Sequence, residues 1–479
     1  MIKYRSLIYW LLISSFASIC FATIFPFNFT VPESLSWQSV FKQFYWATNI
    51  KDYIRNILLF IPLGIGLAGT ISIKKFNYYQ IIIITLFISA ILSTNIELIQ
   101  ILLPSRFSSM SDIICNSLGG ALGGILYCWR SDIIHFIYAI LRGDTTQINL
   151  KQLAIVIASY CLVITLSIWF LKININLSNW DDDYYLAIGS EVTGKTAWKG
   201  YMTSLYICDR SLDNQEVIQA FEQTHTFFSQ LPSLVTSLVF LDEQEKYSDN
   251  TQQLPDLVWQ SELTLPQTNY VSNSLANSDD LDYQIHHNKT VSFKREKSLK
   301  TEFPAFSLNK KLKQSNEFSL SLTAASNRLK QVGPARIISL AESISERNLM
   351  IGQEKRNLTF RVRTPTTGDT AAQPEFIIPN IFDDYNLHQI LITYTQGKLT
   401  FYIDQPSHQY NYEFRPSTTY VFYLPWTING WRVNLRDFNL LQSQFTFYGI
   451  ILLPLAILIN ASILLLISSN SPYSRTKLH

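Results

Sequence analysis

The sequence predicts a multi-domain chain in which an α-helical transmembrane bundle of about six helices is joined to an all-β sandwich. Apolar residues make up 47% of the 479 residues, charged residues make up only 15%, and the mean hydropathy is +0.10. The apolar residues gather in the first third and near the C-terminus, whereas residues 173–443 have the composition of an ordinary polar, aromatic-rich globular domain. The chain is long enough for a membrane bundle and for a domain with its own core.

Six apolar stretches are long enough to cross the hydrocarbon core of a bilayer, which takes roughly 20 helical residues. The first stretch follows Lys3 and Arg5, as a signal peptide would, but Ile19 is a poor lipobox residue before Cys20 and no small-x-small cleavage site follows. An uncleaved helix is therefore favoured. The stretches lie near residues 6–25, 54–73, 78–103, 111–129, 152–171 and 445–468.

These stretches divide the chain into four parts. Residues 1–130 are predicted to form a four-helix bundle, and residues 131–172 an interfacial segment with the fifth helix. Residues 173–443 are predicted to form the β-sandwich, and residues 444–479 the sixth helix and a tail. The apolar run 133–141 is too short to span, so we expect it to lie along the inner membrane interface.

The basic residues predict the direction of the helices, because Lys and Arg are retained on the cytoplasmic side of short loops. If the helices simply alternate, nine basic residues near their ends fall on one side. That side is the cytoplasm, so both termini are expected inside and the β-sandwich outside. The nine residues are Lys3, Arg5, Lys74, Lys75, Arg130, Arg142, Lys151, Arg475 and Lys477.

Charge and cysteine content exclude several classes of function. A formal net charge of +2 does not suggest a nucleic-acid surface. Cys208 is the one cysteine of the polar middle region, which therefore holds no internal disulfide, and no C-x-x-C metal spacing occurs. We expect no metal and no cofactor, and we interpret Asp383, Asp384 and Asp404 as turn residues in preference to calcium ligands.

Several polar residues lie in the apolar stretches, where a central charge costs about 2.5 to 3.5 kcal/mol. Glu97 and Gln100 are three apart and Asp112 and Asn116 are four apart, so each pair lies on one face of its helix. Alternating helix directions bring all these residues to one depth in the outer leaflet. The candidate ligand-binding residues are Arg55, Asn56, Glu97, Gln100, Arg106, Asp112 and Asn116.

This layer of polar residues has three interpretations. The first is a set of interhelical hydrogen bonds, and the small residues of the run 119–124 would let the helices approach closely. In the second, Arg55 and Arg106 bind a phosphate or carboxylate of an envelope lipid or lipid-linked precursor. In the third, Glu97 is an acid or base, but no nucleophile or histidine accompanies it, so no catalytic residue is predicted. We expect Glu97 to contact Arg55 or Arg106, since an unpaired carboxylate in apolar surroundings would neutralise.

Four segments in this order resemble the VanZ-like family, and the resemblance covers residues 1–130 approximately. It implies a bacterial membrane protein of a family named for a role in resistance to the glycopeptide teicoplanin. The segments are 52–64 (DYIRNILLFIPLG), 97–100 (ELIQ), 103–106 (LPSR) and 111–120 (SDIICNSLGG).

Alternating runs in the polar region predict antiparallel strands in two sheets. The clearest is a hairpin whose runs, 389–394 and 399–404, flank a turn at Gln396 and Gly397. Similar runs lie at 318–323, 335–340, 348–352 and 358–363.

This region resembles a laminin-G-like or concanavalin A-like lectin jelly roll at His388 and at residues 392–394, 397–399 and 402–404, with Gln405 in place of the usual glycine. Segments that resemble the closing strands of that fold, at 186–190, 198–201 and 205–212, come first instead. A circularly permuted sandwich is favoured over an interrupted first copy. Permutation predicts that strands within 184–210 pair with the C-terminal half and that Trp198 is buried.

The functional expectation is an envelope protein of the bacterial inner membrane that binds or senses a cell-wall, lipid-linked or glycan component outside the cell, with a link to teicoplanin-type resistance. The expected partners are membrane lipids or a lipid-linked cell-wall precursor for the bundle, and an extracellular glycan or protein for the sandwich. The alternative is a membrane enzyme that acts on a lipid-linked envelope substrate at the outer leaflet.

Overall fold

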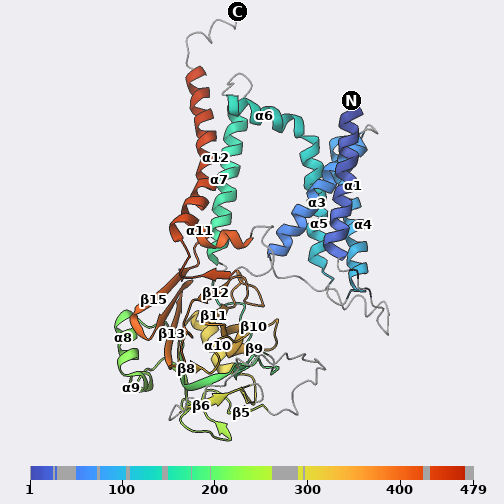
Figure 1. Cartoon of the computed structure of the whole chain (residues 1–479). Helices are drawn as coiled ribbons and strands as arrows, with labels where there is room; N and C mark the ends of the chain where they lie inside the picture. Colours follow the sequence, from blue (N-terminus) through green and yellow to red (C-terminus); the bar gives the residue numbers. More distant parts are fainter. Residues whose placement is uncertain are drawn as a thin grey trace, which may run out of the picture. The chain divides into compact units, whose positions relative to one another are not determined.

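The computed structural model of the chain forms two compact units, one helical and one rich in β-strands (Figure 1). The helical unit comprises Met1–Thr165, Tyr423–Thr427 and Gly449–His479, and the β-rich unit comprises Leu166–Phe422 and Ile428–Tyr448. The predicted combination of apolar helices with a β-rich region is confirmed. The structure describes residues 2–24, 27, 29, 50–72, 76–103, 108–142, 149–173, 175–194, 196–260, 290–294, 297–423 and 432–469.

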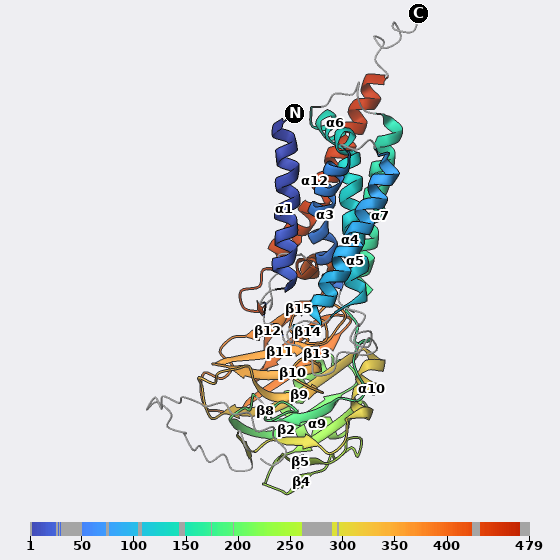
Figure 2. The same cartoon turned by 90° about the vertical axis from the view of Figure 1, so that its right-hand side faces the viewer.

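The first helices of the chain pack into a bundle, in which α5 lies against both α3 and α4 and α1 lies against α3 (Figures 1 and 2). Two later helices pair with each other, since Leu153 of α7 is buried against Leu458 and Leu465 of α12 and the Tyr160 hydroxyl donates to the Ile451 carbonyl at 2.9 Å. The helices are α1 (Ile2–Ile24), α3 (Ile50–Ile71), α4 (Tyr78–Gln100), α5 (Met110–Cys128), α6 (Arg130–Arg142), α7 (Leu150–Ile173) and α12 (Leu440–Ser469).

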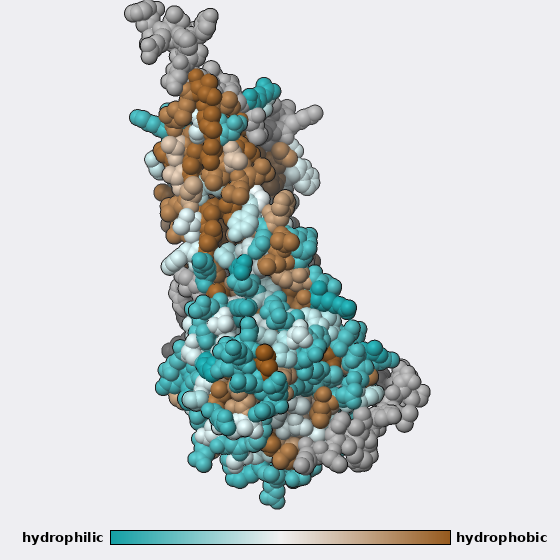
Figure 3. Space-filling model, turned by 90° about the vertical axis from the view of Figure 1, so that its left-hand side faces the viewer, coloured by the Kyte–Doolittle hydropathy of each residue, from teal (hydrophilic) through white to brown (hydrophobic). Residues whose placement is uncertain are grey.

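Among the described residues, five helices are long and apolar enough to cross a membrane, against the six stretches predicted. The predicted stretch 111–129 does form a helix, α5, but it is not one of the five. Its glycines together with Asp112 and Asn116 lower its hydropathy, and one face is buried against α3 and α4. On the face that Figure 3 shows, the helical unit is largely hydrophobic, whereas the β-rich unit is largely hydrophilic. The five spans are Ser6–Ile24, Asp52–Ile71, Tyr78–Gln100, Leu150–Lys172 and Leu440–Ile467.

Glycines bring α5 into backbone contact with α3, as the small-residue run predicts. A Cβ added at Gly123 would lie 2.3 Å from the Ile61 carbonyl oxygen, and one added at Gly64 would lie 2.2 Å from the Gly120 carbonyl oxygen. Only hydrogen fits at these positions, so the helices approach more closely than larger side chains would allow.

The β-rich unit consists of two sheets whose neighbouring strands are antiparallel, except that β12 and β16 are parallel. The nine-stranded sheet has the order β16 (Arg432–Asn434), β12 (Glu375–Ile378), β11 (Asn357–Val362), β10 (Arg347–Glu354), β9 (Ala335–Ala341), β1 (Tyr185–Ile188), β7 (Leu299–Thr301), β5 (Leu257–Trp259) and β4 (Lys246–Tyr247). The seven-stranded sheet has the order β15 (Gln405–Glu413), β14 (Lys398–Ile403), β13 (His388–Thr395), β8 (Glu317–Ser326), β2 (Gly200–Cys208) and β3 (Leu234–Val239), with β6 (Val291–Phe293) also paired to β2.

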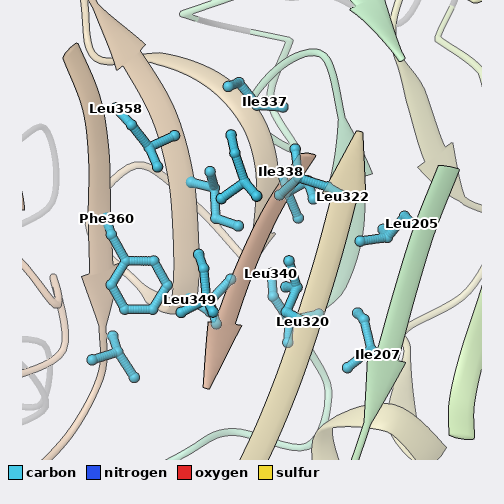
Figure 4. Packing of buried hydrophobic residues seen from close by; sticks show 14 of the residues in the cluster. Leu205, Ile207, Leu320, Leu322, Ile337, Ile338, Leu340, Leu349, Leu358 and Phe360 are labelled. Carbon is cyan, nitrogen blue, oxygen red and sulfur yellow. The ribbon is translucent and has the colours of Figure 1, made fainter. Parts of the chain in front are cut away.

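One continuous apolar core lies between the two sheets. Figure 4 shows side chains of β2 and β8, such as Leu205 and Leu322, on one side of this core and those of β9 and β11, such as Ile338 and Phe360, on the other. The outer face of the seven-stranded sheet is covered by α8 (Asn214–Glu222) and α9 (Thr224–Ser229), whose Phe228 ring stacks on Tyr206 of β2. The remaining short helices are α10 (Phe306–Ser315), α11 (Pro416–Thr419) and the 3-10 helix η4 (Tyr420–Tyr423).

The predicted hairpin and the predicted strand pairing are both confirmed. β13 and β14 pair antiparallel, and Gln396 and Gly397 between them both have positive φ angles of 46° and 80°, as a tight hairpin turn requires. The early strands join the later ones, since β1 pairs with β9 and β2 pairs with β8 over most of its length. Trp198 is fully buried and donates its ring N–H to Gln353 Oε1 at 2.8 Å.

Candidate functional site

The end of α4 meets the beginning of α5 at Glu97. The Glu97 side chain is only 1% exposed, and its Oε2 accepts a hydrogen bond of 2.8 Å from the backbone N–H of Ser109, the residue that precedes α5. The Ser108 hydroxyl donates to the Glu97 carbonyl at 2.7 Å. The free N–H groups of a helix N-terminus favour a negative charge, so α5 supplies the partner that a buried carboxylate needs.

Three further contacts connect the helices at the same level. Gln100 donates to the Thr23 carbonyl at the end of α1 at 3.0 Å, and Asn116 of α5 donates to Ser93 Oγ of α4 at 2.8 Å. The Asn56 side chain of α3 forms a hydrogen bond with the Asp112 carboxylate of α5. The structure therefore brings together Asn56, Glu97, Gln100, Asp112 and Asn116.

Among the described residues Glu97 makes no direct ion pair with Arg55, and its carboxylate instead accepts a hydrogen bond from Ser109. Arg55 instead forms an ion pair of 3.7 Å with Asp52, one turn earlier on the same helix. The reason is geometric, because the polypeptide connecting α4 and α5 brings backbone N–H groups directly to the carboxylate. Arg106, the other predicted partner, lies outside the described residues.

Sequence reasoning missed the serines at the start of α5. Ser108, Ser109 and Ser111 are all buried, and the hydroxyls of Ser109 and Ser111 lie 2.6 Å apart. The sequence did contain a signal for these serines, since serine is favoured at helix N-termini, where its side chain accepts hydrogen bonds from free backbone N–H groups. We call the group of buried and half-buried residues Asn56, Glu97, Gln100, Ser109, Asp112 and Asn116 the polar layer.

Two oxygen atoms of the polar layer have no hydrogen-bond donor within the described part of the chain. They are Oδ1 of Asp112 and Oδ1 of Asn116, and both are buried. Both atoms lie on α5 one helical turn apart, and both can only accept hydrogen bonds. The layer is therefore suited to a group that carries donors, such as hydroxyls or an ammonium group. Over the residues described, no cluster of three or more His, Cys, Asp or Glu side chains is arranged to hold a metal.

Comparison with known proteins found a family match for the helical bundle. Residues 6–134 match the model of the VanZ/LLP1 family. This part of the chain is similar to VanZ-like domains, and we refer to it below as the VanZ-like domain. No match was found among curated proteins or among solved structures.

The segments on which the resemblance to the VanZ-like family rests include residues of the polar layer. The motif that begins at Asp52 contributes Asn56, the ELIQ motif contributes Glu97 and Gln100, and the SDIICNSLGG motif contributes Asp112 and Asn116. The glycines at the end of the last motif make the close contact with α3. The segments that resemble the family therefore supply the contacts between the helices. They also position Asp112 Oδ1 and Asn116 Oδ1, the two acceptors without a donor among the described residues.

In the β-rich unit, Asp384 and Asp404, which were predicted as turn residues, both contact the ring of His388. His388 Nδ1 lies 2.8 Å from Asp404 Oδ2, and its Nε2 lies 3.1 Å from Asp384 Oδ1. Burial alone would lower the pKa of His388, but the hydrogen bonds and negative charges of Asp404 and Asp384 raise it above its ordinary value. The two carboxylates therefore act as partners of a histidine that favours its protonated form.

Proposed function

We propose that the chain is an envelope protein of the bacterial inner membrane that binds a lipid-linked or cell-wall component through the polar layer of its VanZ-like domain. The observation that supports this most directly is the pair of buried acceptors, Asp112 Oδ1 and Asn116 Oδ1. A buried polar atom without a partner costs about 1 to 3 kcal/mol. A ligand that donates hydrogen bonds to both atoms removes this cost, which favours a headgroup that carries hydroxyl or ammonium donors.

The family points to the same class of ligand. VanZ-like domains are linked to glycopeptide resistance in general, and glycopeptides act on the cell wall. We therefore propose a cell-wall precursor carried on a membrane lipid as the ligand, with a contribution to teicoplanin-type resistance. Arg106 is the proposed contact for the phosphate of such a precursor.

The proposed orientation places both termini in the cytoplasm and the β-rich unit outside the cell. Its support is the distribution of basic residues, because Arg130, Arg142 and Lys151 border the connection between α5 and α7, whereas the polar layer lies at the opposite ends of the helices. An outward-facing polar layer suits a precursor that is displayed on the outer leaflet.

We further propose that the β-rich unit is a circularly permuted concanavalin A-like or laminin-G-like jelly roll that binds a glycan or a protein outside the cell. Support comes from β1 and β2, which resemble closing strands of that fold, stand first in the chain and pair with β9 and β8. Fold alone does not establish a ligand, so this part of the proposal depends on a direct binding measurement.

Binding of a purified lipid-linked cell-wall precursor to the full chain in lipid nanodiscs tests the proposal. We expect saturable binding that weakens by about tenfold or more in Asp112→Ala and in Asn116→Ala, since tenfold corresponds to about 1.4 kcal/mol. Ser117→Ala is the matched control, because the Ser117 hydroxyl donates to the Ile113 carbonyl of its own helix. Equal binding by all four proteins would reject the polar layer as the site.

The same preparation separates binding from catalysis. If the wild type converts the precursor and Glu97→Gln abolishes the conversion, the protein is an enzyme and the binding proposal is wrong. A glycan-array screen of the full chain tests the β-rich unit independently, because its result does not depend on the polar layer.

A further inference from the structure

A buried arginine in the β-rich unit has two guanidinium nitrogens without hydrogen-bond partners in the part of the chain that the structure describes. Arg347 begins β10, its side chain is 1% exposed, and neither its Nε nor its Nη1 has a hydrogen-bond partner within the described residues. Its neighbour across the strands is Ala341, which belongs to a small cluster with Ala187 and Val192 separate from the main core. Arg347 therefore lies on the outer face of the nine-stranded sheet.

The two carboxylates whose charges act on Arg347, those of Glu191 and Glu375, are bound to other residues. Glu191 accepts hydrogen bonds from Arg336 Nε at 3.0 Å and from the Ser339 hydroxyl at 2.7 Å. Glu375 lies 2.9 Å from Arg361 and 3.0 Å from Arg432, which also pairs with Glu354. This network contains one more positive charge than negative charges: Arg336, Arg347, Arg361 and Arg432 stand against Glu191, Glu354 and Glu375.

The excess charge is on Arg347, where burial makes it costly. Burial, and then the positive charge of Arg336, lower the pKa of Arg347 to about 10, so the guanidinium still carries its charge at neutral pH. An uncompensated buried ion costs several kcal/mol even after the protein relaxes. A buried guanidinium with free N–H donors and no carboxylate of its own requires another source of negative charge.

The connection between β11 and β12 encloses this position. The backbone N–H of Arg347 donates to the Asp369 carbonyl at 3.1 Å, and Arg363 Nη2 lies 2.6 Å from Asp369 Oδ1. Thr367 and Ala371 of the same connection are buried. A group bound at Arg347 is therefore shielded from water, which strengthens charge-assisted hydrogen bonds and limits the size of the group.

We propose that Arg347 is the centre of a buried binding site for one small monoanion, of halide or carboxylate chemistry. A single negative charge balances the network of four arginines and three glutamates, whereas a phosphate dianion would exceed it. The free Nε–H and Nη1–H donate to the anion. This site is independent of the proposed function of the VanZ-like domain, because no residue of the helical unit takes part in it.

Thermal unfolding of the full chain in detergent tests the site. Intrinsic tryptophan fluorescence, to which the buried Trp180 and Trp198 contribute, follows the unfolding. Sodium chloride or sodium acetate replaces sodium gluconate, whose anion is too bulky for an enclosed site, at constant ionic strength. We expect the unfolding temperature of the wild type to rise with chloride or acetate by about 2 to 4 °C or more and then to saturate, as a bound ligand requires. Arg347→Met should not respond. Arg356→Met, which removes the same charge from an exposed position, should respond like the wild type.

Saturation with chloride alone identifies a halide site, and saturation with acetate alone identifies a carboxylate site. A wild type that responds to neither anion, or an Arg347→Met variant that responds like the wild type, overturns the proposal. If Arg347→Met does not fold, the chloride NMR resonance provides a second test of the site. The wild-type protein should broaden this resonance, and an excess of bromide or acetate should remove the broadening. Absence of both broadening and a thermal response to acetate excludes the site.

Discussion

The backbone N–H of Ser109 donates a hydrogen bond of 2.8 Å to Glu97 Oε2, and this contact joins the end of α4 to the beginning of α5. It gives the buried carboxylate a partner that belongs to the polypeptide backbone. We therefore expect Glu97→Ala to destabilise the helical unit by about 1 to 3 kcal/mol, because it leaves the Ser109 N–H without its acceptor. Glu97→Gln keeps an acceptor and should cost less. Thermal unfolding in detergent measures both variants, and equal stability of Ala and wild type would contradict the assignment.

The separate partners of Arg55 and Glu97 predict that these residues are not strongly coupled. Arg55→Ala and Glu97→Ala should be additive to within about 0.5 kcal/mol in the free energy of unfolding, since Arg55 pairs with Asp52 and Glu97 with Ser109. A double-mutant cycle provides the measurement. A coupling energy well above that value would mean that the arginine and the glutamate interact after all. The predicted coupling of Glu97 to Arg106 is tested by the same cycle with Arg106→Ala and stays a prediction.

Close packing of α5 against α3 predicts that replacing a glycine of α5 by alanine destabilises the bundle. Gly123→Ala should destabilise the bundle although alanine favours helices, because the new Cβ would lie 2.3 Å from the Ile61 carbonyl oxygen. Gly449→Ala is the matched control in α12, since no atom lies within 4 Å of its added Cβ, and it should be neutral or slightly stabilising. Thermal unfolding of the two variants distinguishes them, and similar unfolding temperatures would show that α3 and α5 are not tightly packed.

We expect Trp198 to stabilise the β-rich unit. It is fully buried in the main core, and its ring N–H donates to Gln353. Trp198→Ala should reduce the free energy of unfolding of the β-rich unit by about 3 to 5 kcal/mol, as for other large-to-small core substitutions. The control is Trp259→Ala, since Trp259 is only partly buried at the edge of the same core. Denaturant unfolding should rank the control between Trp198→Ala and the wild type.

The histidine held by two aspartates predicts a pH dependence of stability. Asp404 and Asp384 outweigh the effect of burial and raise the pKa of His388, so its contribution is fully present below the unfolded pKa of about 6.5. The contribution is lost as the pH rises through the higher pKa of the folded state. The unfolding temperature of the wild type should therefore fall over this range relative to that of His388→Gln. Parallel pH profiles for the two proteins would argue against a charged His388.

The proposed orientation predicts which positions face outward. In a background without the five native cysteines, Asn250→Cys and Thr370→Cys should react with an impermeant thiol reagent in intact cells, since both residues are exposed on the β-rich unit. Lys75→Cys and Arg475→Cys should react only after the membrane is permeabilised. Labelling at position 75 from outside would reverse the proposed topology.

Local patterns were sufficient to predict much of the structure. The hairpin around Gln396 and Gly397 follows from alternation and turn chemistry within a few residues, and the apolar helices follow from composition alone. The pairing of Glu97 with Gln100 and of Asp112 with Asn116 in the polar layer was also predictable, because helical spacing places each pair on one face of its helix. The partner of Glu97 was not, since the prediction considered side-chain charges and left out the backbone donors of a helix terminus.

The sequence by itself therefore determined the membrane helices, the β-strands and the residues that hydrocarbon disfavours, because each of these depends on short-range spacing and on the cost of placing polar groups among apolar ones. Tertiary structure decided which groups meet. Glu97 finds Ser109 only because α4 and α5 are joined at that point, and Arg347 is enclosed without a carboxylate only because Glu191 and Glu375 pair with other arginines. Such pairings depend on the three-dimensional packing of strands and helices, so no spacing along the chain records them.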